Sequence, residues 1–268
     1  MSGFSADWLA LREPYDLRAR NPAVLDNVVA AFAEHPTVAI VDLACGTGSM
    51  VRALAPRLRA RQAWRVIDND LSLLARASVT LAPARAQVTA VPLDLNLDLE
   101  AALGAPIDLV TASALLDLVS ENWLERLTVE TALRSVSVYA TLSYDGRIVF
   151  DPSDAADAEI VAAVNTHQRR DKGFGPALGP TAAHTAIRQF QALGYVVVQG
   201  TSDWVFGAGD REIQLEICAG WAHAARETGM ASRTVAGWLA RRRGAIAAGR
   251  SSIRVGHVDL FARPMGTR

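Results

Sequence analysis

Cysteine, lysine and long apolar runs are scarce in this 268-residue sequence, and each scarcity excludes a class of protein. The two cysteines, Cys45 and Cys218, are too few for a disulfide-framed domain and are typical of a reducing compartment. No apolar run is long enough to span a membrane, and the first residues lack the basic segment and apolar core of a signal peptide. We therefore expect a cytoplasmic protein without a membrane partner.

An excess of positive charge is also absent, which argues against a nucleic-acid partner. Lys172 is the single lysine, and the formal net charge is −1. The basic run 241–243 is explained by a solvated helix face. No histidine stands at a metal-ligand spacing from another histidine or from a cysteine pair, so we expect no metal site. The histidines are His35, His167, His184, His223 and His257.

A short apolar strand that runs directly into a glycine turn is the most informative segment, residues 38–51. In dinucleotide-binding enzymes this turn has the sequence G-x-G-x-x-G and binds a pyrophosphate. Here Gly46 and Gly48 are followed by Val51, so the third glycine is missing. Asp42 stands just before the turn, where it would face a phosphate unfavourably. The pattern favours a cationic or amine-bearing ligand.

The letters D-L-A-C-G-T-G at residues 42–48 resemble motif I of the class I S-adenosylmethionine (SAM) dependent methyltransferases, a Rossmann-like superfamily. SAM carries a sulfonium and an amino group and no phosphate, which agrees with an acid at the end of the strand. The resemblance implies that this turn binds SAM. The residues it assigns to the cofactor are Asp42, Ala44, Cys45, Gly46 and Gly48.

Asp68 follows the second expected strand, 20 positions after Gly48. An acid at this place in a βαβ unit can accept both ribose hydroxyl protons, in NAD enzymes and SAM enzymes alike. We assign Asp68 and the neighbouring Asn69 to the cofactor. The alternative is that Asp68 or Asp70 only caps the next helix; Asp70 is the better cap and Asp68 the better ribose ligand.

The ends of the third and fourth expected strands carry further cofactor candidates. The resemblance implies that Asp94 accepts from the adenine amino group and that Leu95 packs on the ring. It also implies that Ala112 and Ser113 face the methionine end of SAM. Asp117 would point toward the methyl-transfer region, where it orients a substrate amine or hydroxyl, or else it caps the next turn.

Strands and helices alternate over residues 38–150, a pattern typical of a doubly wound parallel α/β sheet. Within it we expect a helix over 121–139, a turn at 144–146 and a fifth strand over 147–150. The alternation places the expected ligand residues at the carboxyl ends of the strands, where ligands bind in such sheets.

The rest of the chain completes the fold that the resemblance implies. We expect a strand over 195–206, a helical insertion at about 210–250 and a last, antiparallel strand over 253–263. The result is a mostly parallel seven-stranded sheet. Residues 1–35 form an N-terminal helical lid, and residues 36–268 form the methyltransferase domain with its insertion between the last two strands.

The resemblance also indicates residues around the acceptor. Tyr15, Arg12 and Arg18 could reach SAM from the lid, unless the lid is a surface helix with solvated charges. Phe174 and Trp204 could pack on an aromatic or cationic acceptor. If the acceptor must lose a proton, the candidates that could take it are Asp117, Asp151 and His167.

We predict a methyltransferase that uses SAM and acts on a small molecule through an N, O or C nucleophile. The Asn-Pro-Pro-Tyr type of motif, which amino-group methyltransferases of nucleic acids place after the fourth strand, is replaced by Ser113-Ala-Leu-Leu. Two alternatives stay open at this point: an NAD-dependent oxidoreductase and a non-catalytic SAM-binding protein. The acceptor, the atom methylated and the oligomeric state are not selected by these motifs.

Overall fold

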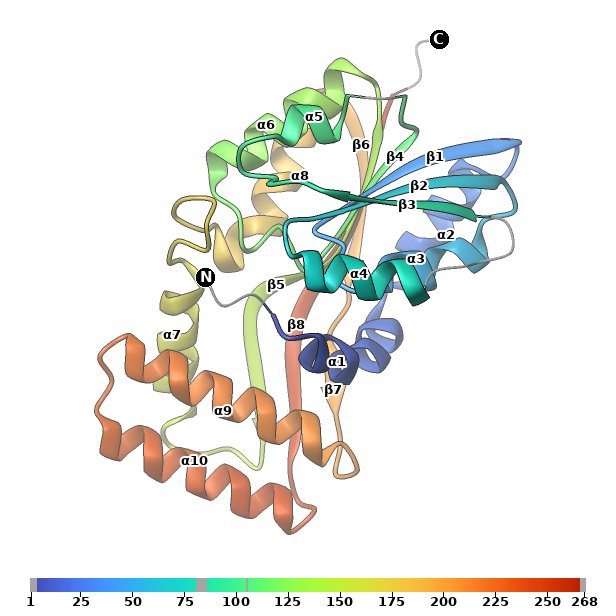
Figure 1. Ribbon diagram of the computed structural model, residues 1–268. Helices are drawn as coiled ribbons and strands as arrows, with labels where there is room; N and C mark the ends of the chain where they lie inside the picture. Colours follow the sequence, from blue (N-terminus) through green and yellow to red (C-terminus); the bar gives the residue numbers. More distant parts are fainter. Residues whose placement is uncertain (1–3, 81–85, 105, 266–268) are drawn as a thin grey trace.

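The computed structural model describes residues 4–80, 86–104 and 106–265, and its strands form one mixed sheet (Figure 1). The strands are β1 (Thr37–Leu43), β2 (Arg61–Asp68), β3 (Ala86–Pro92), β4 (Leu109–Ser113), β5 (Ser137–Asp151), β6 (Tyr195–Thr201), β7 (Trp204–Phe206) and β8 (Ser252–Pro264). Their order is β3-β2-β1-β4-β5-β8-β6, and β7 also pairs with β8. The first five strands are parallel, whereas β8 runs antiparallel to β5, β6 and β7. The prediction of a mostly parallel α/β sheet with an antiparallel last strand is confirmed.

Helices cover both faces of this sheet, as a doubly wound fold requires. They are α1 (Ala6–Ala19), α2 (Pro22–Ala31), α3 (Ser49–Leu54), α4 (Leu71–Thr80), α5 (Leu99–Ala102), α6 (Glu121–Leu133), α7 (Asp157–Gln168), α8 (Ala182–Ala192), α9 (Arg211–Glu227) and α10 (Ser232–Ala247), with 3-10 turns at Ala55–Arg57 and Gly179–Thr181. One apolar core packs α2, α3 and α4 on the sheet, and a second packs α5, α6 and α8 on the other face. In the described parts of the chain, no helix is both long and apolar enough to cross a membrane.

The predicted helix over 121–139 is wrong at its carboxyl end. Helix α6 stops at Leu133, and Ser135 has a φ of +53°. Val136 then donates its N–H to the carbonyl of Thr131 at 2.9 Å, a bond that closes helix ends of the Schellman type. The residues that follow are rich in β-branched and aromatic side chains, and they form the first half of β5.

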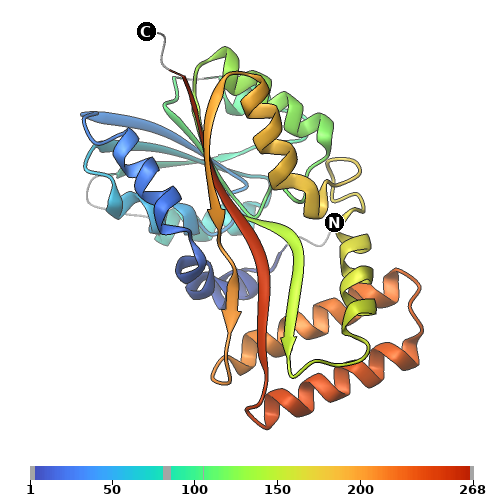
Figure 2. The same cartoon turned by 180° about the vertical axis from the view of Figure 1, so that it is seen from behind.

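The predicted turn at 144–146 is also wrong, because β5 passes straight through it. The pairing of β5 with β8 shifts register between Ala140 and Ser143 and again between Tyr144 and Ile148. The Asp-Gly pair therefore sits in a bulge of a long strand and does not reverse the chain. The expected strand over 147–150 is the second half of β5, which extends well beyond the main sheet (Figure 2).

The sheet has eight strands where seven were predicted, because the expected strand over 195–206 is interrupted. Ser202 and Asp203 separate β6 from β7, and both bind the backbone of His257 in β8: Ser202 donates to its carbonyl at 2.9 Å, and Asp203 accepts from its N–H at 3.3 Å. Helices α9 and α10 follow β7 and precede β8. Together with α7 and the extended ends of β5 and β8 they enclose a third apolar core below the main sheet (Figure 1).

Several helices begin at residues whose side chains cap the first free N–H groups of the helix. Asn21 accepts from the N–H of Val24 at 3.1 Å at the start of α2. The predicted cap at Asp70 is confirmed, since its Oδ1 accepts from the N–H groups of Ser72 and Leu73 at 2.8 and 3.2 Å. Asp70 thus belongs to α4, which leaves Asp68 for another role.

Candidate functional site

A cavity of about 1210 Å3 lies at the carboxyl ends of the parallel strands. Its upper part is lined by the turns that follow β1, β2 and β4. Its lower part is lined by side chains from α1, α7, α9, β7 and β8, which belong to or pack on the third core. The main sheet and the helical insertion therefore share one cavity.

The glycine turn after β1 is held in left-handed backbone conformations at Ala44, Gly46 and Gly48, with φ values of +51°, +54° and +84°. A Cβ atom at Gly46 would lie 3.0 Å from Cδ1 of Leu9 in α1. Position 46 therefore requires glycine for its backbone and for the close approach of the N-terminal helix. Of this turn, Ala44, Cys45 and Gly46 line the cavity, whereas Gly48 begins α3.

Asp68 joins this turn to the end of β2. Its Oδ2 accepts from the N–H of Gly46 at 2.8 Å, and its Oδ1 accepts from the N–H of Asp70 at 3.0 Å. Burial raises the pKa of the carboxyl, and these hydrogen bonds oppose the shift. Asp68 and Asn69 both line the cavity. Each carboxylate oxygen can accept a further hydrogen bond, so the carboxylate can still bind the two hydroxyls of a diol.

Asp42 lies deeper, with only 1% of its surface exposed. Thr111 donates its hydroxyl to Oδ1 at 2.8 Å, while Oδ2 has no hydrogen-bond partner among the described residues. Burial raises the pKa of Asp42 to about 7, and the bond from Thr111 and the nearby charge of Arg20 oppose this. A buried acceptor without a donor, at the wall of a cavity, fits a ligand that brings an N–H group.

The candidates after β3 and β4 divide into two groups. Leu95 and Ser113 line the cavity. Asp94 and Ala112 are not in its wall: the Oδ1 of Asp94 accepts from the N–H of Asn96 at 2.8 Å, and Ala112 is buried in the strand.

Of the three residues of the N-terminal helix that were expected to reach SAM, only Arg12 lines the cavity. Tyr15 donates its hydroxyl to Asp210 at 3.0 Å and carries the guanidinium of Arg18 over its ring at 4.5 Å, and neither residue lines the cavity. Arg12 and Asp16, which are four residues apart and therefore neighbours on this helix, do line it. They form a buried ion pair at 2.9 Å, and α1 therefore covers the cavity through this pair.

The lower part of the cavity, which we call the lower chamber, brings together residues that are far apart in the sequence. The predicted residues Asp117, His167, Phe174 and Trp204 all line it. Tyr144 and His257 line it as well, and no sequence pattern indicates them. Asp151, in contrast, is exposed at the far end of β5 and is not in the wall. The long β5 explains this, since the strand passes the cavity around residue 142 and continues past it.

His257 is fixed in one tautomer by its own strand. Its Nδ1 lies 3.1 Å from the carbonyl oxygen of Val255, so Nδ1 carries the proton and Nε2 is left as an acceptor. The ring lies 4.7 Å from that of Trp204. Burial lowers the pKa of His257 to about 3, with the charge of Arg12 acting in the same direction, so the imidazole is neutral. No motif or spacing signals this residue in the sequence.

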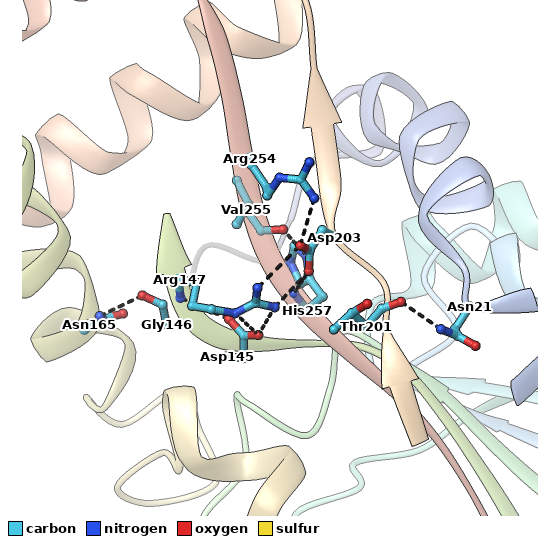
Figure 3. Close-up of polar contacts among 10 residues, drawn as sticks. All are labelled: Asn21, Asp145, Gly146, Arg147, Asn165, Thr201, Asp203, Arg254, Val255 and His257. Atoms are coloured by element: carbon cyan, nitrogen blue, oxygen red, sulfur yellow. Dashed lines mark hydrogen bonds and ion pairs between the residues drawn. The ribbon is translucent and has the colours of Figure 1, made fainter. Parts of the chain in front are cut away.

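A polar cluster behind β8 holds this strand in place (Figure 3). Asp203 accepts from the N–H of His257 and from the guanidinium groups of Arg147 and Arg254, at 2.9 and 3.3 Å for the two ion pairs. Asp145 in the bulge of β5 binds Arg147 through Nε at 2.7 Å. The break between β6 and β7 therefore serves to place Asp203 beside His257.

Replacement of Gly256 by alanine is expected to disturb this cluster. The new Cβ would lie 2.2 Å from Oδ1 of Asp145 and 2.9 Å from Cβ of Arg147, closer than atoms can approach. We expect Gly256→Ala to lower the free energy of unfolding by about 1–3 kcal/mol, measured by urea denaturation. Gly220→Ala is the control, since a Cβ atom at that site in α9 would have no described atom within 4 Å apart from its chain neighbours and the backbone of its own helix, and the change should be neutral or stabilising. Equal stability of the Gly256 variant and the wild type would contradict the geometry.

The rim of the lower chamber is closed by polar contacts between α7 and α9. His167 lies 2.7 Å from Glu227 through Nε2 and 3.5 Å from the amine of Lys172 through Nδ1. Burial lowers the pKa of His167, and Glu227 opposes the shift. His167 is therefore engaged at both nitrogens in the rim.

No protein-family model and no curated protein sequence matches this chain. Solved structures do. A cyclopropane-fatty-acyl-phospholipid synthase-like protein from Lactobacillus casei matches with a TM-score of 0.56 and 13% identity, over 97% of this chain and 94% of that one. The cyclopropane synthase MmaA2 from Mycobacterium tuberculosis matches with a TM-score of 0.51 and 10% identity, over 97% and 95%.

A putative methyltransferase from Bacillus halodurans also matches, with a TM-score of 0.50, 14% identity and coverage of 91% of this chain and all of that one. At such identities the likeness speaks for the fold alone. The strand order, the antiparallel β8 and these near full-length matches agree with each other. The chain has the fold of the class I SAM-dependent methyltransferases.

Proposed function

We propose that this protein transfers the methyl group of SAM to a small-molecule acceptor. The observation that carries the proposal is the single cavity, which joins the glycine turn and Asp68 to a chamber lined by Asp117, Trp204 and His257. Methyl transfer requires two reactants to be held in line and shielded from water, and enzymes gain much of their rate from such positioning. A cavity with two chemically distinct halves supplies both places.

The residues present fit the cofactor. Asp68 would accept from the ribose hydroxyls, Asp42 would take an N–H from the amino-acid end through its unpartnered Oδ2, and Leu95 would pack on the base. SAM, when bound, supplies an electrophilic methyl group on a sulfonium, and the surrounding residues need only orient the acceptor and exclude water. Leu9, whose side chain lies against Gly46, helps to close this half of the cavity.

An NAD-dependent oxidoreductase is the weaker proposal. Val51 stands where the third glycine of the dinucleotide motif would allow close packing, and its side chain is completely buried against the sheet. Asp42 adds a buried carboxyl at the strand end. Both features disfavour a pyrophosphate at this turn.

Calorimetric titration tests the assignment. We expect SAM and S-adenosylhomocysteine (SAH) to bind with micromolar dissociation constants, and NADH to give no signal. Binding of NADH in place of the sulfur ligands would overturn the proposal in favour of the oxidoreductase. Formation of SAH in the presence of an acceptor would exclude a purely SAM-binding role.

A further inference from the structure

We infer that the methyl acceptor is an amine whose N–H group donates to Asp117, an inference that rests on the proposed methyltransferase function. The evidence is which hydrogen-bond donors and acceptors of the lower chamber already have partners in the protein. Some of its polar side chains are hydrogen-bonded within the protein, and others keep an acceptor atom that is free to bind a ligand.

Asp117 is a buried acidic group of this chamber that forms no ion pair with any described residue. The residue is 5% exposed, its Oδ1 has no hydrogen-bond partner in the described structure, and no ion pair there involves it. A buried carboxylate with an unused oxygen is costly unless a ligand supplies a donor. The wall of the cavity includes this residue, so a bound molecule can supply it.

The neighbouring polar groups are already satisfied. Tyr144 donates its hydroxyl to Asn165 at 2.8 Å, and Trp204 donates its indole N–H to Asp16 at 2.9 Å. Asp16 also neutralises Arg12 at 2.9 Å. Because the polar atoms of Tyr144 and Trp204 are used by these bonds, their rings offer apolar surfaces to a ligand. The charge of Arg12 is compensated by Asp16.

His257 adds a second acceptor to the chamber. Since its Nδ1–H is used by the carbonyl of Val255, its Nε2 can accept but not donate. Asp117 and His257 together therefore require a ligand with more than one donor hydrogen. A primary or secondary amine, which enters as an ammonium ion, meets this requirement; a single hydroxyl does not.

The apolar walls agree with a cationic guest. Tyr144, Trp204, Trp221 and Phe174 line the chamber, and aromatic faces attract ammonium groups and N-methylated products. A carboxylate in the same place would be repelled by Asp117, and His257 could offer it no donor.

The transfer step balances in protons and electrons. The ammonium gives one proton to the carboxylate of Asp117, which frees the nitrogen lone pair. The lone pair then forms the N–C bond to the methyl carbon while the C–S bond breaks, and its electrons stay on sulfur as the neutral thioether of SAH. The positive charge passes from sulfur to nitrogen.

The surroundings of Asp117 set the pKa at which its carboxyl group exchanges a proton with the amine. Burial raises its pKa to about 6. Hydrogen bonds from the backbone N–H groups of Asp117 and Tyr144 oppose the shift, as do the charges of Arg12 from α1 and Lys172 from the segment after α7. His257 is neutral throughout the physiological range. Amine binding requires the ionised carboxylate, so the affinity should be lost as the pH falls through about 6 and be retained at pH 8.

The experiment uses SAH-loaded full-length protein and two matched sets of probes. One set is phenethylamine, 2-phenylethanol and phenylacetate; the other is tryptamine, tryptophol and indole-3-acetate. Saturation-transfer NMR with competition gives the relative affinities. We expect the amine of at least one set to bind at least tenfold more tightly than its alcohol and acid partners.

Asp117→Asn should weaken that amine at least tenfold and leave SAH binding unchanged. Asp151→Asn, an equal loss of charge outside the cavity, is the matched control and should change neither. The decrease of wild-type affinity between pH 8 and pH 5 supplies a second test that needs no variant. Stronger binding of the alcohol or acid, no binding by any amine, or equal amine binding by Asp117→Asn would overturn the inference. Failure of SAH itself to bind would overturn the proposed function as well, and the two failures are therefore distinguishable.

Discussion

Replacement of Arg12 by methionine should lower the free energy of unfolding by about 3 kcal/mol, because it leaves the carboxylate of Asp16 buried without its counter-ion. Arg12 and Asp16 are 7% and 3% exposed, and their ion pair measures 2.9 Å. Methionine conserves much of the apolar stem, so packing on the ring of Trp204 is largely kept. Urea denaturation of the purified variant gives the value.

The double variant Arg12→Met/Asp16→Asn separates the lost charge partner from lost packing. Asparagine can still accept from the indole N–H of Trp204 through its Oδ1, and it carries no charge. We expect it to recover most of the stability lost in the single variant. If the single variant is as stable as the wild type, the pair is solvated and the description of a buried bridge is wrong.

The pH dependence of the same variant has a defined sign. Burial already raises the pKa of Asp16, and Arg12 is the largest opposing influence. Without Arg12, the folded-state pKa rises further above the unfolded value, so the folded state favours the protonated acid. Stability relative to the wild type should therefore be lost as the pH rises, with a larger deficit at pH 8 than at pH 5.

The parts of the fold that the sequence predicts well are the ones with local signals. The turn after β1 is marked by Gly46 and Gly48, whose positive φ values require glycine or strain. Asn21 and Asp70 mark helix starts through side-chain bonds to nearby N–H groups. Such signals depend on residues within a few positions of each other, and they can be found without knowing the tertiary structure.

The errors lie where tertiary pairing overrides a local signal. The segment 137–151 reads as a helix end, a turn and a short strand, yet pairing with β8 keeps it extended as one strand. The Asp-Gly step at 145–146 is tolerated because the strand bulges there. Once β5 was predicted too short, Asp151 was placed near the site, whereas the structure puts it at the far end.

The lower chamber was predictable only in part for a related reason. Asp117 and Trp204 are single residues with suitable chemistry, but the contact between Trp204 and Asp16 joins positions 188 residues apart. His257 lies in a strand pattern, residues 253–261, in which no second histidine or cysteine marks a site. Those long-range contacts decide which charges are paired. That Asp16 is paired and Asp117 is not can therefore be known only from the structure.

Asp68→Asn should weaken SAH binding by a factor of at least about 10. The two oxygens of Asp68 already accept from the N–H groups of Gly46 and Asp70 at 2.8 and 3.0 Å, and the proposed ribose contacts share the same oxygens. An amide replaces one of the oxygens by a donor, so one ribose bond is lost; the backbone bond lost with it is made in the free and the bound protein alike and affects stability more than affinity. Hydrogen bonds to a charged group contribute about 1.5–3 kcal/mol each, and about 1.4 kcal/mol corresponds to a tenfold change in Kd.

Asp70→Asn is the matched control for this change. It removes the same charge two residues away, and asparagine is as good a helix cap as aspartate. We expect its SAH affinity to stay within about threefold of the wild type, since its carboxylate is used by Ser72 and Leu73 at the start of α4. Equal losses in the two variants would show that net charge, and not a ribose contact, governs affinity.

A ligand change distinguishes a ribose contact from collapse of the glycine turn. Adenosine and 2′,3′-dideoxyadenosine differ only in the two hydroxyls that Asp68 is proposed to bind. The wild type should prefer adenosine by at least about tenfold, the value of one lost hydrogen bond to a charged group, and Asp68→Asn should bind both alike. If the variant weakens both nucleosides equally and keeps the preference, Asp68 acts by holding Gly46, and the diol is bound by another residue of the cavity.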